Sequence, residues 1–182
     1  MRWHWWSMVL VLGCAPPGWA AEPGSPYAGQ EKREIKALSD EEIQGYLTGS
    51  GMGLAKAAEL HHYPGPRHVL DLAEALQLSD EQRQHTQTIF EHMQTEAVRL
   101  GTHLLDRERQ LEALFASGTI AEASLEQVVA DITTTQGHLR TVHLRAHLAQ
   151  RDILTPEQLR RYDTLRGYDA PSPHRAHPQR GH

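Results

Sequence analysis

The sequence predicts an all-α protein built on a long antiparallel helical hairpin with short flanking helices. Apolar residues recur at intervals of three, four and seven over residues 80–116, which is typical of one long amphipathic helix. A second segment with the same spacing begins at about residue 121 and ends before residue 154. The join contains Ser117-Gly118, and so short a connection makes the two helices antiparallel neighbours. No stretch shows the strict alternation that a β-strand requires.

Composition limits the classes of function. The chain has 182 residues and a formal net charge of −5, from 23 acidic and 18 basic residues. Such a protein lacks the dense basic surface that nucleic-acid phosphates require, so we expect no nucleic-acid partner. The single cysteine, Cys14, excludes an internal disulfide framework and a cysteine-rich metal site. We find no nucleotide loop, nucleophile elbow or His-Glu-x-x-His motif and expect no enzyme. The 13 histidines are a surplus that needs an explanation.

Residues 1–21 have the layout of an export signal. Arg2 precedes the apolar stretch 5–12, and the segment ends in small residues at Ala20-Ala21. This segment is too short to be a permanent membrane-spanning helix. In an alternative interpretation, Cys14 belongs to a rough lipobox and carries a lipid that anchors the protein to a membrane. Both interpretations place the working part outside the cytoplasm, in the periplasm of a Gram-negative cell.

Two segments that precede the hairpin are predicted to differ in order. Residues 22–37 combine Pro, Gly and charge with little apolar content, which predicts a flexible lead-in. Residues 38–65 are expected to form short helices and to end in a Pro-Gly-Pro turn. Ser39 can cap the first of these helices while Glu42 reaches back to the cap. A second short helix is expected over residues 54–60.

Prolines and the tail composition predict the other elements. Pro66 can take the first position of a helix over residues 67–77, because proline is tolerated where no N–H is needed. Pro156 can do the same for a short final helix that ends near residue 166. Residues 169–182 form a histidine-containing tail that is disordered by composition.

Two similar segments open the first long helix and the last short helix. They read Leu78-Ser79-Asp80-Glu81-Gln82 and Leu154-Thr155-Pro156-Glu157-Gln158. In each, a hydroxyl side chain can cap the helix while a glutamine three positions later reaches back to it. The pair resembles the two LTxxQ motifs of the Spy/CpxP family of periplasmic chaperones and stress regulators, with serine in place of the first threonine. The motif positions are Leu78, Ser79, Gln82, Leu154, Thr155 and Gln158.

The resemblance covers residues 66 to 166, within a domain that we place at residues 66–168. It implies a homodimer with a concave face that needs no cofactor and no ATP. Such a protein holds unfolded or misfolded envelope proteins, or modulates a sensor kinase or another regulator of envelope stress. A neighbouring branch of similar architecture consists of periplasmic heavy-metal sensors and zinc-associated proteins. That branch would account for the histidines, so a metal sensor or resistance protein is the alternative function.

Four side chains on the two long helices are predicted to converge on one metal ion. His143 and His147 are spaced i, i+4, which lets two imidazoles hold one ion. Antiparallel pairing with equal rise per residue places His92 opposite about residue 146, and Glu96 follows one turn later. Nitrogen and carboxylate ligands of this kind suit zinc, nickel, cobalt or copper(II). The alternative is that these residues simply belong to polar helix faces.

Histidines have two further uses. The tail residues His174, His177 and His182 can bind metal weakly, because a flexible tail gives little geometric selectivity. Many of the 13 histidines can also gain charge near about pH 6 and make the net charge positive. Acid would then change client binding or dimer packing.

Some apolar residues lie off the main seam of the hairpin. Leu105, Leu144 and Leu148 can form a second apolar surface for a dimer or a client. They can instead pack against the flanking short helices, which we favour for Leu144. Gly101 is expected to face Gly137, which indicates a close backbone approach, a shared bend or a local weakness of both helices.

Overall fold

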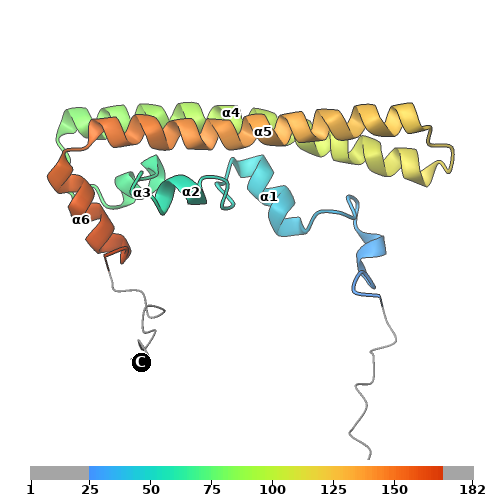
Figure 1. Cartoon of the computed structure of the whole chain (residues 1–182), viewed down its shortest axis with the longest axis horizontal. Coiled ribbons are helices and arrows are strands. Elements are labelled where there is room, and N and C mark those ends of the chain that lie inside the picture. Colours follow the sequence, from blue (N-terminus) through green and yellow to red (C-terminus); the bar gives the residue numbers. More distant parts are fainter. Residues whose placement is uncertain (1–24, 170–182) are drawn as a thin grey trace, which may run out of the picture. The chain divides into compact units, whose positions relative to one another are not determined.

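The computed structural model describes residues 25–169, and every regular element in that range is helical. The chain divides into two compact units, residues 1–32 and residues 33–182. In the first, the described residues include the 3-10 helix η1 (Gln30–Lys32). In the second they include α1 (Asp40–Thr48), α2 (Lys56–Glu59), α3 (Pro66–Asp71), α4 (Asp80–Ala116), α5 (Glu122–Ile153) and α6 (Pro156–Arg166), drawn in Figure 1. The predicted all-α hairpin with short flanking helices is confirmed.

The α4–α5 hairpin forms because two amphipathic stripes bury each other. α4 begins after Ser79, whose hydroxyl accepts a hydrogen bond from the Gln82 N–H at 3.1 Å. Gly118 takes a φ of +66° in the turn that joins the helices, a conformation that costs glycine little. Burial of apolar area along the seam supplies the main stabilisation of the hairpin. The buried seam residues are Met93, Ala97, Leu100, Leu104, Val128, Ile132, Leu139 and Ala146.

The short helices pack along one face of the hairpin (Figure 1). α1 and α3 contact α4, while α2 and α3 contact α5. We call this the covered face, and it carries Gly101, His143 and His147. The face that carries His92 and Arg145 is called the open face, because the groove on it is lined by α4 and α5 alone. Packing of α1–α3 therefore makes the two faces of one hairpin chemically different.

Gly101 allows α1 to lie close to α4. A Cβ at this position would collide with the backbone carbonyl of Tyr46, whose side chain packs among the core residues beneath α1. A Cβ at Gly137 would meet nothing within 4 Å. The close approach at Gly101 is therefore to α1 and not to Gly137, because a third helix occupies the space over α4.

Two expectations about the flanking segments are wrong. The helix that begins at Pro66 ends at Asp71 rather than at residue 77, and turns follow it. Leu76 and Leu78 both enter one buried cluster, which requires the chain to leave the helical path before α4. The lead-in also ends in ordered structure: Ile35 is fully buried beside Leu105. Burial of this one apolar side chain outweighs the polar composition around it.

The end of the hairpin next to α6 has its own apolar core. Val69, Leu76 and Leu78 from the α3 region pack with Leu154 and Tyr162. Tyr162 on α6 is fully buried there. This cluster joins α3 and α6 to the point where α4 begins and α5 ends.

Candidate functional site

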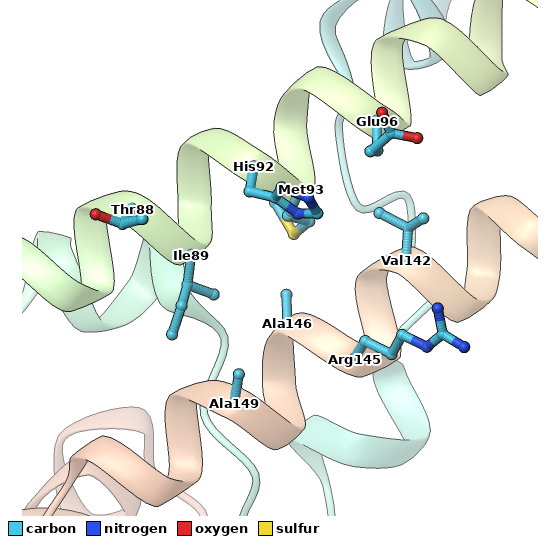
Figure 2. Close-up of a pocket in the computed structure, with 9 residues that line it drawn as sticks. All are labelled: Thr88, Ile89, His92, Met93, Glu96, Val142, Arg145, Ala146 and Ala149. Carbon is cyan, nitrogen blue, oxygen red and sulfur yellow. The ribbon is translucent and has the colours of Figure 1, made fainter.

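The open face contains a groove of about 540 Å³ between α4 and α5. Small side chains create it, because Ala146 and Ala149 leave space between the helices that larger residues would fill (Figure 2). Ile89, Met93 and Val142 make the remaining floor apolar. The complete lining is Thr88, Ile89, His92, Met93, Glu96, Val142, Arg145, Ala146 and Ala149.

Polar side chains border this apolar floor on both helices. His92 and Glu96 come from α4, and Arg145 comes from α5 (Figure 2). A hydrogen bond from Arg99, 2.9 Å from the Glu96 carboxylate, lowers the pKa of Glu96. The Arg145 guanidinium has no ion pair or hydrogen bond within residues 25–169. The groove therefore combines an apolar floor with an uncompensated positive charge.

The four expected metal ligands do not come together. His92 and Ala146 line the same groove, as the antiparallel pairing predicts. His143 and His147 instead line a second pocket on the covered face, and each is more than 90% buried. At about 100° per residue they lie roughly 60° and 100° around α5 from Ala146, turned towards α3. Pairing residues by their rise along the hairpin gives their position along the helix axis, but it does not give the direction in which each side chain points around that axis.

No other cluster replaces the expected metal site. Within the described range, no group of three or more His, Cys, Asp or Glu side chains is placed to hold a metal ion. The tail histidines His174, His177 and His182 lie outside the described residues. Cys14 and the export signal also lie outside them.

One covered-face histidine, His147, lies beside a buried polar network centred on Glu59, with its Nδ1 3.7 Å from the Glu59 carboxylate. The Glu59 carboxylate accepts hydrogen bonds from Tyr162 at 2.5 Å, Tyr168 at 2.9 Å and the Gly65 N–H at 3.2 Å. Arg166 lies 3.4 Å from it. Burial alone would raise the pKa of Glu59, but hydrogen bonds from His68, Tyr162 and Tyr168 outweigh burial and lower it to about 2. Sequence reasoning missed Glu59, because a glutamate in a short polar helix resembles a surface residue.

His147 contacts this network through one ring nitrogen. Its Nδ1 lies 2.7 Å from the Tyr63 carbonyl oxygen, and since a carbonyl only accepts, Nδ1 is the donor. His143, one turn earlier, is 3% exposed and its Nε2 has no hydrogen-bond partner among the described residues. Burial, with a smaller contribution from His147, lowers the pKa of His143. Both covered-face histidines therefore act within the fold and are poorly placed to meet a partner.

The two glutamines of the paired motifs meet at the α6 end of the hairpin. The side-chain amides pair with each other: Gln82 Nε2 lies 2.8 Å from Gln158 Oε1, and Gln158 Nε2 lies 2.9 Å from Gln82 Oε1. Gln82 also contacts the Ile153 carbonyl at 3.0 Å, and Gln158 contacts the Leu76 carbonyl at 3.3 Å. Each glutamine completes the capping box of its own helix as well. The spacing of the motifs thus places two caps where they lock α4, α5 and α6 together.

A family model confirms what the motifs indicate. The LTXXQ motif family protein model matches residues 66–166, more than half of the chain. The chain belongs to this family. The match is the signature of Spy/CpxP-type proteins, which are typically periplasmic and not enzymes. No curated protein and no solved structure matches the chain. No helix in the described part of this LTXXQ protein is long and apolar enough to cross a membrane.

The three leucines proposed as a second surface have different environments in this LTXXQ protein. Leu105 is fully buried against Ile35 and Leu38, so its assignment to a binding surface is wrong. Ile35, which belongs to the segment that composition predicts to be flexible, covers Leu105. Leu144 is half-buried, whereas Leu148 is 54% exposed. Of the three, Leu148 is the one most available to a partner.

Proposed function

We infer that this protein is an ATP-independent chaperone of the envelope, which holds unfolded or misfolded segments weakly in the open-face groove. Membership of the LTXXQ family supports this class of function. The observation that carries the proposal is the lining of the groove, an apolar floor between charged side chains on one exposed hairpin face. Unfolded chains expose apolar side chains beside polar backbone, and this lining complements both.

The proposal includes the protein's surroundings. We propose that the mature protein acts in the periplasm, either free or held by a lipid at Cys14, and that it forms a homodimer. Clients are unfolded envelope proteins, and a sensor kinase or stress regulator is a second class of partner. We propose that holding a client requires no cofactor, because the burial of apolar surface needs none.

Filling the groove tests the proposal. Ala149 lines it, whereas Ala130 is exposed on the same helix and does not. An Ala149→Gln variant should need several-fold more protein to suppress aggregation of a chemically unfolded client, because the longer polar side chain occupies the floor. Ala130→Gln is the matched control and should behave as the natural protein does. Equal suppression by all three proteins would contradict the assignment of the groove.

A chelator separates this function from the metal-sensing alternative. Chaperone activity of the proposed kind should persist in excess chelator, because no metal participates in holding a client. A metal-dependent activity would disappear and return on addition of zinc, nickel, cobalt or copper. Light scattering of the aggregating client measures both arms.

A further inference from the structure

We propose that the open face selects client segments whose apolar residues are flanked by carboxylates, and that this selection strengthens as the pH falls from about 7.5 to about 6. This inference rests on the proposed function, since it concerns the same groove. It specifies the chemistry of the client and the condition that regulates binding.

Histidines continue along α4 beyond the groove. His85, His92, Arg99 and His103 fall within a sector of about 40° around the helix axis. All four are exposed, and His92 lines the groove. Because His85 and His103 share the sector of His92, they lie on the open face, one before the groove and one after it along α4. The groove thus lies along a longer stripe of exposed histidines on α4.

The second helix contributes a similar stripe. His138, Arg145 and Asp152 are spaced by seven residues and also fall within about 40°. All three are exposed, and Arg145 lines the groove. His138 and Asp152 therefore share the open face with Arg145. Four histidines, three on α4 and one on α5, therefore border the same face of the hairpin.

Permanent charges on this stretch nearly cancel. The carboxylates are those of Glu81, Glu96 and Asp106 on α4 and of Asp131 and Asp152 on α5. The guanidiniums are those of Arg99, Arg107 and Arg145. Arg99 pairs with Glu96 at 2.9 Å and Arg109 pairs with Asp106 at 3.2 Å, which leaves an excess of one negative charge. The charge of this face is therefore decided by its imidazoles.

Histidine is the residue type that gains a positive charge between about pH 8 and about pH 5. Protonation of the four exposed imidazoles would make the open face clearly positive, while the apolar floor stays unchanged. A positive rim attracts carboxylates and accelerates their encounter, and it repels cationic segments. The complementary client is an apolar segment with Asp or Glu on both sides.

Three peptides with one apolar core and different flanks test this inference. Fluorescence polarisation with the full chain, at low salt, measures their affinities at about pH 7.5 and about pH 6. The Asp-flanked peptide should bind about threefold or more tightly at the lower pH, and the Lys-flanked peptide more weakly. The Ser-flanked peptide should bind equally at both. An Asp-flanked peptide with the same affinity at both pH values would overturn the inference.

Variants assign the effect to the stripe. Replacing His85, His92, His103 and His138 by Gln should abolish the pH dependence for the Asp-flanked peptide. Replacing only His85, His103 and His138, which lie outside the groove, should reduce the pH dependence and leave the Ser-flanked affinity unchanged. His61→Gln is the control, because His61 is exposed but lies outside the groove and the two stripes. Retention of the pH dependence in the fourfold variant would refute the role of these histidines, and His92→Gln alone should reduce it in part.

The outcomes also separate the two proposals. If the Ser-flanked peptide binds and the Asp-flanked peptide gains nothing at low pH, the chaperone proposal stands and the inference fails. If no peptide binds at either pH, the groove is not a client site and both fail. Circular dichroism at each pH verifies that the proteins compared are folded.

Discussion

The two faces of the hairpin use the same residue types for opposite purposes. On the covered face, His143 and His147 are buried and Glu59 is surrounded by donors. On the open face, His92 and Glu96 border a groove and remain accessible. The difference arises from the short helices, which exclude water from one side of α4 and α5 and leave the other side to solvent. The role of a polar residue here depends on its rotation about the helix axis, and its type alone does not reveal that role.

Glu59 and Glu96 should differ most. Glu59→Gln should destabilise the protein by about 3 kcal/mol, because it removes a buried charge that several donors stabilise. Glu96→Gln should leave the unfolding midpoint unchanged, since the partner of Glu96 among residues 25–169 is the exposed Arg99. Urea unfolding followed by circular dichroism measures both. Equal midpoints for Glu59→Gln and the natural protein would contradict the network's importance.

Glu59 should also make the stability of the protein depend on pH in acid. The pKa of Glu59 is lowered from 4.5 to about 2 in the fold, so its stabilising contribution is complete above about pH 4.5. That contribution is lost as the pH falls from about 4.5 to about 2, because the unfolded chain takes up the proton first. Glu59→Gln should flatten the stability profile in this window, whereas an unchanged slope would show that another group is responsible.

The two glycines facing different environments should respond with opposite signs. Gly101→Ala should cost about 1–3 kcal/mol, because its Cβ would displace α1 at the Tyr46 carbonyl. Gly137→Ala should stabilise by roughly 0.5–1 kcal/mol, because alanine favours the helix and nothing obstructs its Cβ. Thermal unfolding of both variants measures the difference. Destabilisation of similar size at both positions would mean that α1 does not set the requirement at Gly101.

Loss of either motif glutamine should weaken the α6 end of the hairpin. Gln82→Ala or Gln158→Ala should cost about 1–2 kcal/mol, since each removes a cap and an interhelical hydrogen bond. The double variant should cost less than the sum, with a coupling of at least about 0.5 kcal/mol, because each single variant already breaks the reciprocal pair. Gln84→Ala, at an exposed α4 position, is the control. Strict additivity would contradict direct pairing.

The smallest effect should separate the histidines of the two faces. The pKa of His143 is lowered by burial, so the unfolded chain binds a proton first and stability falls as the pH drops below about 6.5. His143→Leu should change the free energy of unfolding by about 1 kcal/mol or less at neutral pH and reduce this acid loss, because the unpaired Nε2 is removed. His92→Leu should retain the full acid loss. Unfolding midpoints between about pH 7.5 and about pH 5.5 test this.

Local signals in the sequence were sufficient for the hairpin. Apolar periodicity, capping residues and a glycine turn each act over a few residues, so they specify where α4, α5 and α6 begin and end. The paired motifs likewise identified the family, because their residues and spacing are linear features of the chain. The register that sets His92 opposite Ala146 followed from equal rise per residue.

Tertiary packing decided which side of each helix is covered. It turned His143 and His147 away from His92 and Glu96, and it buried Leu105 beneath Ile35. It also collected donors around Glu59 of α2 from the turn before α3 and from the α6 region. These outcomes depend on how short helices with weak local signals pack against the hairpin. The free energy of that packing comes from contacts between residues distant in sequence, which no local pattern of the chain encodes.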